Sequence, residues 1–229
     1  MTYTESSVLA QPLAVGGYHY PPFMIDSTEK GLYVKLTEAI EQHSSVKFQW
    51  KYYPFARADH LFNLGYVHLE VGSSPLWNQT KPVPGLYTDT FYELEDVAVF
   101  HKNRPFRARN IQDIKNQKVG IVRGYSFPQF TQTFNKNIAS KIEGANEDQL
   151  LHLLISKRID QVFMSKHVFL YLKKHNQEYK ELDYVDVVGR YPISMRVHPK
   201  RQSVIPELNQ AIQQLKQKKI IEKIFELAR

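Results

Sequence analysis

The sequence predicts an α/β protein of two lobes, each a mixed, mainly parallel sheet flanked by helices. Over residues 13–71, short apolar strands alternate with amphipathic helices in the order β-α-β-α-β. A polar segment at 102–105 interrupts the pattern, and a new series of strands and helices begins at residue 118. The 229 residues are enough for two lobes of roughly 100 residues each.

The composition excludes several classes of protein. The hydrophobic fraction of 42% suits a folded core, and no run reaches the roughly 18 to 20 apolar residues that span a bilayer. Cysteine is absent, which excludes disulfide scaffolds, thiolate zinc sites and cysteine nucleophiles. The nine histidines show no ligand-like spacing. We therefore expect no metal and no cofactor.

The charge balance and the amino terminus bear on partners and location. The formal charge is +7, but the basic residues are scattered apart from a cluster at 216–219, and no nucleic-acid-binding motif is present. We expect no nucleic-acid partner. Residues 1–7 lack the basic and apolar segments of a signal peptide, so an exported form would have had its signal removed.

The first series of elements follows from the spacing of apolar residues, prolines and glycines. The expected elements are a strand at 13–17, a rigid aromatic loop at 18–23, a helix from 31 to about 43, a strand at 46–50, a helix at 55–64 that Gly65 ends, and a strand at 67–71.

The strand at 67–71 runs into Gly72-Ser73-Ser74-Pro75. In open α/β sheets, ligands bind beyond the carboxyl ends of strands, where these two hydroxyls lie. An ordinary strand-to-loop turn is the alternative interpretation.

The second series has a similar order. Ser126 is expected to N-cap a helix that has Pro128 in its first turn, and Asn146 with Gln149 has the spacing of a capping box. The other expected elements are a strand at 95–100, a helical turn at 111–114, strands at 118–122 and 161–164, a helix at 168–174, extended segments at 184–188 and 191–197, a helix from Pro206, and a second apolar set at 220–225.

Six segments carry short patterns: Tyr20-Pro21-Pro22-Phe23, Gly31-Leu32 with the helix behind it, and residues 61–69, 118–124, 153–162 and 205–212. In this order they resemble the aromatic-x-Pro-Phe, Gly-Phe-x-x-Asp-Leu, Leu-x-x-Gly-x-Val-Asp-Leu, Lys-x-Val-Gly-Val-x-x-Gly, Leu-x-x-Gly-Arg-Val-Asp-Ala-Val and Leu-x-x-x-Leu-Asn-x-Ala-Leu segments of one family. That family is family 3 of the type II periplasmic solute-binding proteins, which holds the polar amino-acid receptors of ABC transporters. The resemblance covers residues 13–227, and its specificity lies in the order of the six segments.

The resemblance implies the two-lobed periplasmic binding protein type II fold, with a ligand cleft between the lobes. It implies a discontinuous lobe 1 of residues 10–99 plus 189–229 and an inserted lobe 2 of residues 100–188. Hinge crossings are expected near 97–102 and 185–191.

The family binds a ligand carboxylate through an arginine just beyond the hydroxyl loop, where this chain has Thr80 or Lys81. Arg57 could compensate, or it could be an ordinary surface arginine. Across the cleft, Arg123, Tyr125 and Ser126 precede a helix, and free amides at a helix N-terminus bind anions. From the resemblance we expect ligand contacts from Ser73, Ser74, Lys81, Arg57, Arg123, Tyr125 and Ser126.

The family's amine-binding aspartate is also missing, because Ser165-Lys166 stands after the strand at 161–164. Glu70, Glu93 or Glu95 would replace it only if they reach the cleft. The expected cleft is therefore cation-rich and favours a carboxylate-bearing or otherwise anionic solute. Aromatic residues at 18, 20, 23 and 77 are either core or a stacking surface, and we take Tyr20, Phe23, Trp77 and Ser165 as further ligand contacts.

The expected function is an extracytoplasmic, periplasmic solute-binding protein without catalysis. It would be a monomer that captures an amino acid or related carboxylate and delivers it to the permease of an ABC-type importer. One alternative is the ligand-sensing domain of a membrane receptor. Another is a cyclohexadienyl dehydratase-like enzyme on the same fold, for which Glu93, His68 and Lys166 are the suggestive positions.

Overall fold

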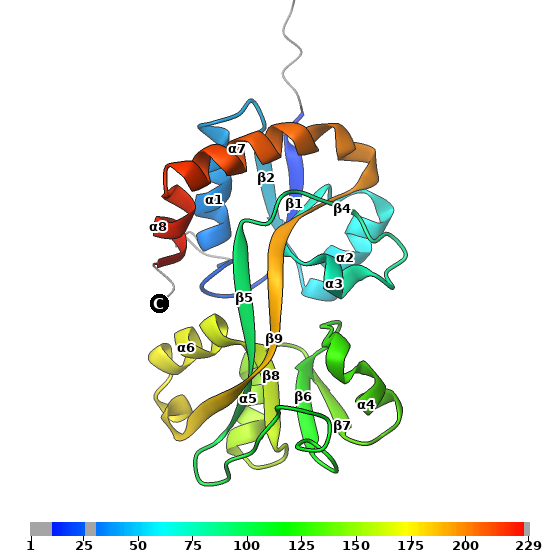
Figure 1. The fold of residues 1–229 in the computed structure, drawn as a ribbon, viewed down its shortest axis with the longest axis vertical. Helices are drawn as coiled ribbons and strands as arrows, with labels where there is room; N and C mark the ends of the chain where they lie inside the picture. Colours follow the sequence, from blue (N-terminus) through cyan, green and yellow to red (C-terminus); the bar gives the residue numbers. More distant parts are fainter. Residues whose placement is uncertain (1–10, 26–30, 227–229) are drawn as a thin grey trace, which may run out of the picture.

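We analysed a computed structural model of the protein, which describes residues 11–25 and 31–226. The amino-terminal segment assessed for a signal, and the expected lobe ends at residues 10 and 227–229, lie outside these residues. Figure 1 shows two α/β lobes, one above the other, joined by two long strands. None of the helices in the described residues is both long and apolar enough to cross a membrane.

The strands form one path in the order β2-β1-β3-β9-β5-β8-β6-β7, and β4 pairs with β9. In the first lobe β1 is parallel to β2 and β3, and in the second β6 is parallel to β7 and β8. The parallel series predicted from both halves of the sequence is therefore confirmed. The strand bounds are β1 Leu13–Gly17, β2 Phe48–Tyr52, β3 Leu69–Ser73, β4 Leu86–Tyr87, β6 Lys118–Val122, β7 Ser140–Gly144 and β8 Gln161–Ser165.

The two long strands, β5 (Tyr92–His101) and β9 (Leu182–Val197), are antiparallel and run through both lobes. The carboxyl end of β9 pairs with β3 of the first lobe, and residues 96–99 of β5 pair with β8 of the second lobe. The expected lobe boundaries stay a prediction. These ladders favour a crossing on β5 a few residues before the expected 97–102.

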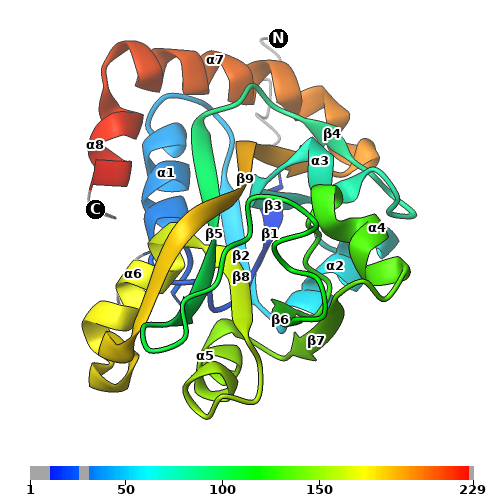
Figure 2. The same ribbon diagram turned by 60° about the horizontal axis from the view of Figure 1, so that its bottom comes forward.

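Helices cover the outer faces of both sheets (Figures 1 and 2). In the first lobe α7 and α8 pack on α1, and α2 packs on β1. In the second lobe α5 packs on β6 and β8. The helix bounds are α1 Leu32–Glu41, α2 Phe55–Leu64, α3 Pro75–Asn78, α4 Thr131–Asn135, α5 Glu147–Ile155, α6 Lys166–His175, α7 Ile205–Gln217 and α8 Ile220–Glu226, with 3-10 turns η1 Pro128–Phe130, η2 Gln177–Glu181 and η3 Pro199–Val204.

Several local predictions are confirmed. Gly65 ends α2 in the left-handed conformation that glycine adopts without a Cβ penalty. The Asn146 side chain accepts from the Gln149 backbone N–H at 2.9 Å. The Gln149 side chain reaches back to the N–H of Ala145, at 2.7 Å, so the capping box is present with its return bond shifted by one residue.

Other local predictions are wrong. The two extended segments at 184–188 and 191–197 are one strand, β9, because its partner β5 pairs along almost its whole length. The strands β4 and β7 were not predicted, since one has two residues and the other is largely polar. Residues 111–114, where a helical turn was expected, do lie in a run of hydrogen-bonded turns.

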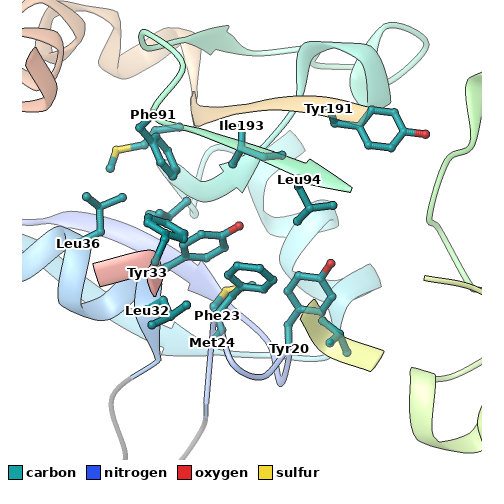
Figure 3. Packing of buried hydrophobic residues seen from close by; sticks show 14 of the residues in the cluster. Tyr20, Phe23, Met24, Leu32, Tyr33, Leu36, Phe91, Leu94, Tyr191 and Ile193 are labelled. Carbon is teal, nitrogen blue, oxygen red and sulfur yellow. The ribbon is translucent and has the colours of Figure 1, made fainter. Parts of the chain in front are cut away.

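Phe23, expected in the ligand site, belongs to the core instead. Its ring is fully buried and lies between the ring of Tyr20, at a centroid distance of 5.5 Å, and that of Tyr33, at 5.0 Å (Figure 3). The aromatic loop thus anchors itself with one ring, which leaves Tyr20 at the edge of the cluster.

The hydroxyl loop is fixed by a close approach at Gly72. This glycine has a φ of +85°, and the β3–β9 register shifts between Val71 and Ser73. A Cβ at Gly72 would lie 2.1 Å from a ring carbon of Tyr33. The strand β3 continues past this glycine to Ser73, whereas the sequence predicted that it ends at residue 71.

We expect Gly72→Ala to destabilise the protein much more than Gly65→Ala. Both positions have a positive φ, which costs an alanine about 1–2 kcal/mol. At Gly65 the nearest atoms are the ends of the His198 and Lys200 side chains, at 3.2 Å. Only Gly72→Ala also drives a methyl group into a buried ring, which adds about 1–3 kcal/mol. Urea unfolding of both variants measures the difference, and equal losses would contradict the close approach.

Candidate ligand-binding cleft

A hollow lined by both lobes lies between them. Its volume, counted with the solvent that opens onto it, is about 840 Å³. The crossing strand β5 contributes Asp96 to it. The first lobe contributes Gly16, Tyr18, Tyr20, Phe55, Ala58, Asp59, residues 70–73, Trp77, Asn78 and Lys81, and the second lobe contributes residues 124–127, Met164 and Ser165.

The lobes touch across this cleft through aromatic rings. The ring centroid of Tyr125, in the second lobe, lies 5.2 Å from that of Phe55 and 6.3 Å from that of Tyr20. A Cβ on the neighbouring Gly124 would lie 2.9 Å from a Phe55 ring carbon. The structure therefore shows the lobes closed on each other.

The structure brings most of the expected ligand-site residues together around this hollow. The predicted residues that line it are Tyr20, Ser73, Trp77, Lys81, Tyr125, Ser126 and Ser165. Tyr18, proposed as a stacking ring, also lines it. Phe23, Arg57, Ser74 and Arg123 do not.

The two arginines expected in the cleft point elsewhere. Arg57 is exposed and its guanidinium lies 5.7 Å from the centre of the Tyr53 ring. The Arg123 side chain is 70% exposed and faces Glu143, with a nitrogen–oxygen distance of 3.7 Å. Lys81 does line the cleft, but its ammonium donates to Asp59 at 2.7 Å. The expectation of a cation-rich cleft is therefore wrong.

The helix N-terminus expected at Ser126 is also absent. The segment starts as the 3-10 turn η1, whose N-cap is Phe127 and makes no side-chain capping bond, and α4 behind it has only five residues. So short a helix offers little macrodipole to an anion. Ser126 lines the cleft as a hydroxyl and not as a cap.

The hydroxyl loop is held by Asn78, which sequence reasoning missed. Its side-chain amide donates to Ser73 Oγ at 2.9 Å, to the backbone carbonyl of Ser74 at 3.1 Å and to the hydroxyl of Tyr87 at 3.0 Å. The other serine of the loop, Ser74, is fully buried. Of the two loop hydroxyls, therefore, only that of Ser73 faces the cleft.

Arg196, on β9, is fully buried behind the first-lobe wall of the cleft. Its Nη1 donates to Glu70 at 2.9 Å and to Asp59 at 3.2 Å. Its remaining nitrogens donate to the backbone carbonyls of Val83 and Pro84. Burial raises the pKa of Glu70, and the adjacent guanidinium opposes that rise. These contacts neutralise two of the carboxylates that line the cleft.

Asp96 is the carboxylate of the cleft that remains without a partner. It is only 6% exposed, and no described residue gives it a hydrogen bond or an ion pair. It lies directly opposite Ser165 in the β5–β8 ladder, so the two side chains share a face. Desolvation, with a smaller contribution from Glu147, raises the pKa of Asp96 to about 8.

Glu147 lies at the start of α5 and lines a second hollow, next to the first and separated from it by the rings of Tyr18, Phe55 and Tyr125. It accepts a hydrogen bond from the hydroxyl of Tyr125 at 3.0 Å. Burial raises the pKa of Glu147 to about 7, and the Tyr125 bond limits that rise. The phenols around it have pKa values raised by burial and stay neutral.

Glu93 and Glu95, considered as substitutes for the missing acid, do not line the cleft. Glu93 is exposed, and Glu95 pairs with Lys166 at 3.2 Å and with Arg190 at 3.0 Å. Glu70, the third candidate, does line the cleft but is bound to Arg196. The unpaired acid of the cleft, Asp96, is the residue after Glu95 on the same strand. The alternation of a strand places it on the opposite face.

Comparison with solved structures settles the fold. An ancestral arginine-binding protein bound to arginine superposes with a TM-score of 0.78 at 20% identity, covering 94% of this chain and 96% of that one. A histidine kinase sensor domain with similarity to periplasmic binding proteins gives 0.81 at 17% identity, covering 93% and 94%. The chain has the two-lobed periplasmic binding protein fold.

A third similar structure, the substrate-binding protein of an amino acid ABC transporter, gives a TM-score of 0.74 at 19% identity, covering 94% of this chain and 98% of that one. No protein-family model and no curated protein matches the sequence. At these identities the likeness establishes the periplasmic binding protein fold alone.

We expect Asp96→Asn to stabilise the ligand-free protein at pH 8 and to change it little at pH 4. The folded protein keeps the Asp96 proton up to about pH 8, whereas the unfolded chain loses it near pH 4. The folded state thus binds more protons between these values, and wild-type stability falls as the pH rises through this window. The variant has no carboxyl group to titrate here, so it avoids this loss in the free energy of unfolding, which is on the order of a few kcal/mol.

Thermal unfolding from pH 4.5 to 8.5 measures this difference. Asp183→Asn, at a side chain that is 48% exposed on β9, is the matched control. Glu147 titrates in the same range and is retained in both proteins, so its contribution largely cancels. A gap between Asp96→Asn and wild type that does not widen with pH would contradict the account.

Proposed function

We propose that the protein binds one small organic solute between its lobes, by closure and without catalysis, and delivers it to the permease of an ABC-type importer. The observation that carries this proposal is the cleft, which takes its lining from both lobes. Among the described residues, β5 and β9 are the two strands that continue from one lobe into the other (Figure 1). A small change in two strands would therefore open and close the whole site.

The similar structures support a solute ligand and an extracytoplasmic role. One is described as bound to arginine, and another as belonging to an amino acid ABC transporter. In this proposal the protein acts as a monomer in the periplasm. Its ligand contacts come from Tyr20, Ser73, Trp77, Lys81, Tyr125, Ser126 and Ser165.

A second candidate is the ligand-sensing domain of a membrane receptor, which the likeness to a histidine kinase sensor domain favours. The chemistry of ligand capture is the same in both cases. The two candidates can be separated by adding the ligand-bound protein to membranes that contain the importer and measuring ATP hydrolysis. A delivery protein stimulates ATP hydrolysis by its transporter, and a sensor domain does not.

Closure can be measured with two spin labels, because the chain has no cysteine of its own. His60 on α2 and Lys136 at the end of α4 are exposed and lie on opposite sides of the cleft. In His60→Cys/Lys136→Cys we expect a ligand from a panel of amino acids, amines and carboxylates to narrow the distance distribution to one short value.

The control pair is His60→Cys/Gln42→Cys, in which both exposed sites lie in the first lobe. Its distance should not respond to ligand. A panel that leaves the cross-lobe distance and the melting temperature unchanged would count against a solute-binding role.

We expect Gly124→Ala to weaken ligand binding by disfavouring the closed form. The added methyl group would meet Phe55 of the other lobe at 2.9 Å, a contact that exists only when the lobes are together. Overpacking of about 1–3 kcal/mol corresponds to a roughly 5- to 150-fold loss of affinity. Gly65→Ala controls for the positive φ, and affinity equal to that of this control would show that Gly124 and Phe55 do not govern closure.

A further inference from the structure

We propose that the cleft selects an organic cation with N–H donors, an amine or a guanidinium, which it holds between Asp96 and Ser165. We further propose that this ligand needs no carboxylate. This inference rests on the proposed function, since it assigns the chemistry of the solute that the closed cleft would hold.

Asp96 and Ser165 form an unpaired acceptor site on the floor of the cleft. They are paired residues of neighbouring antiparallel strands, so their side chains project from the same face about 5 Å apart. Asp96 is 6% exposed and Ser165 is 2% exposed. No described residue donates to the carboxylate, and the Ser165 hydroxyl has no hydrogen-bond partner.

A buried carboxylate without a partner is costly, and a ligand that supplies both positive charge and N–H donors removes that cost. Two acceptors side by side suit a primary amine or a guanidinium, each of which has several N–H groups. A quaternary ammonium has none and would satisfy only the charge.

The walls of the cleft also suit a cation. Tyr18, Tyr20, Phe55 and Tyr125 form a ring cluster in which successive centroids lie 5.0 to 6.3 Å apart. Trp77 lines the same space. Aromatic faces attract cations through their quadrupole, and the attraction strengthens where water is excluded.

The basic groups near the cleft already have acidic partners. Lys81 is bound to Asp59, and Arg196 lies behind the wall, bound to Glu70 and Asp59. A ligand carboxylate would have to take Lys81 from Asp59. Among the described residues that line the cleft, acidic side chains outnumber basic ones, so a second negative charge on the ligand would be unfavourable.

The test is isothermal titration of the full chain with agmatine, arginine, putrescine, choline and succinate. Agmatine and arginine differ by the carboxylate alone. We expect wild type to bind agmatine or putrescine more tightly than choline, and arginine no more tightly than agmatine. We expect Asp96→Asn to lose at least 100-fold in affinity for the amine or guanidine, and Ser165→Ala about 5-fold.

Asp183→Asn, outside the cleft, should bind like wild type. In the closed, ligand-free form burial raises the pKa of Asp96 to about 8, so a cation that binds this form at pH 7 should release up to one proton, measured in buffers of different ionisation enthalpy, and Asp96→Asn should release none. Asp96→Asn is a suitable probe because we expect it to fold at least as well as wild type.

The possible results separate this inference from the proposed function. Closure on succinate or on another panel member without a cation, or an Asp96→Asn affinity equal to that of wild type, would overturn the inference and leave solute binding intact. Arginine binding far more tightly than agmatine would overturn the claim that no carboxylate is needed. Absence of closure with every solute tested would overturn both.

Discussion

The antiparallel pairing of β5 with β9 is the interaction on which the rest of the structure depends. The ladder extends from Tyr92–Ile193 to His101–Leu182, with one end in each lobe. β9 joins it to the first-lobe sheet by pairing with β3, and β5 joins it to the second-lobe sheet by pairing with β8. Because both sheets share it, one main hydrophobic cluster contains residues of both lobes, for example Leu36 on α1 and Leu151 on α5. In the proposed closure, the angle between the lobes would change where this ladder bends.

The same ladder determines which side chains reach the ligand. Its register shifts between Asp96 and Val97, and Asp96 turns its carboxylate into the cleft while Glu95 pairs with Lys166 and Arg190 outside. Beyond the Tyr92–Ile193 end of the ladder, β9 pairs with β3 and places Arg196 behind the first-lobe wall. A single pair of strands thus supplies the unpaired acid of the cleft and the buried base that neutralises two others. The charge presented to a ligand follows from this arrangement and not from the net charge of +7.

The fold could be predicted from the sequence because its signals are local. The alternation of apolar residues, Gly65 at the end of α2 and the capping box at Asn146 each act within a few residues. The loops after β3 and β6, which the sequence indicated as ligand loops, both line the hollow between the lobes. The direction of individual side chains did not. Arg123 adjoins Tyr125 in sequence, but it pairs with Glu143 on the outside of β7.

The role of Asp96 depends on partners distant in sequence, and therefore no local pattern indicated it. Ser165 was recognised as the position of a missing carboxylate, but the residue opposite it across the ladder is known only once β5 and β8 are paired. The sequence around Ser165 therefore shows no acid, whereas the structure places one directly opposite it, on the neighbouring strand.

The position of Asp96 also explains how closure could depend on the ligand. When the lobes are open, water solvates its carboxylate; when they close on an empty cleft, the carboxylate must take up a proton or remain unsolvated. A cation removes this requirement because it replaces the proton as the partner of the acid. Closure around a cation is then favoured over empty closure by the cost of protonating the acid, which grows as the pH rises toward the raised pKa of about 8. The aromatic rings that exclude water make this difference larger, so the rings and the acid act together, and neither alone would make closure selective.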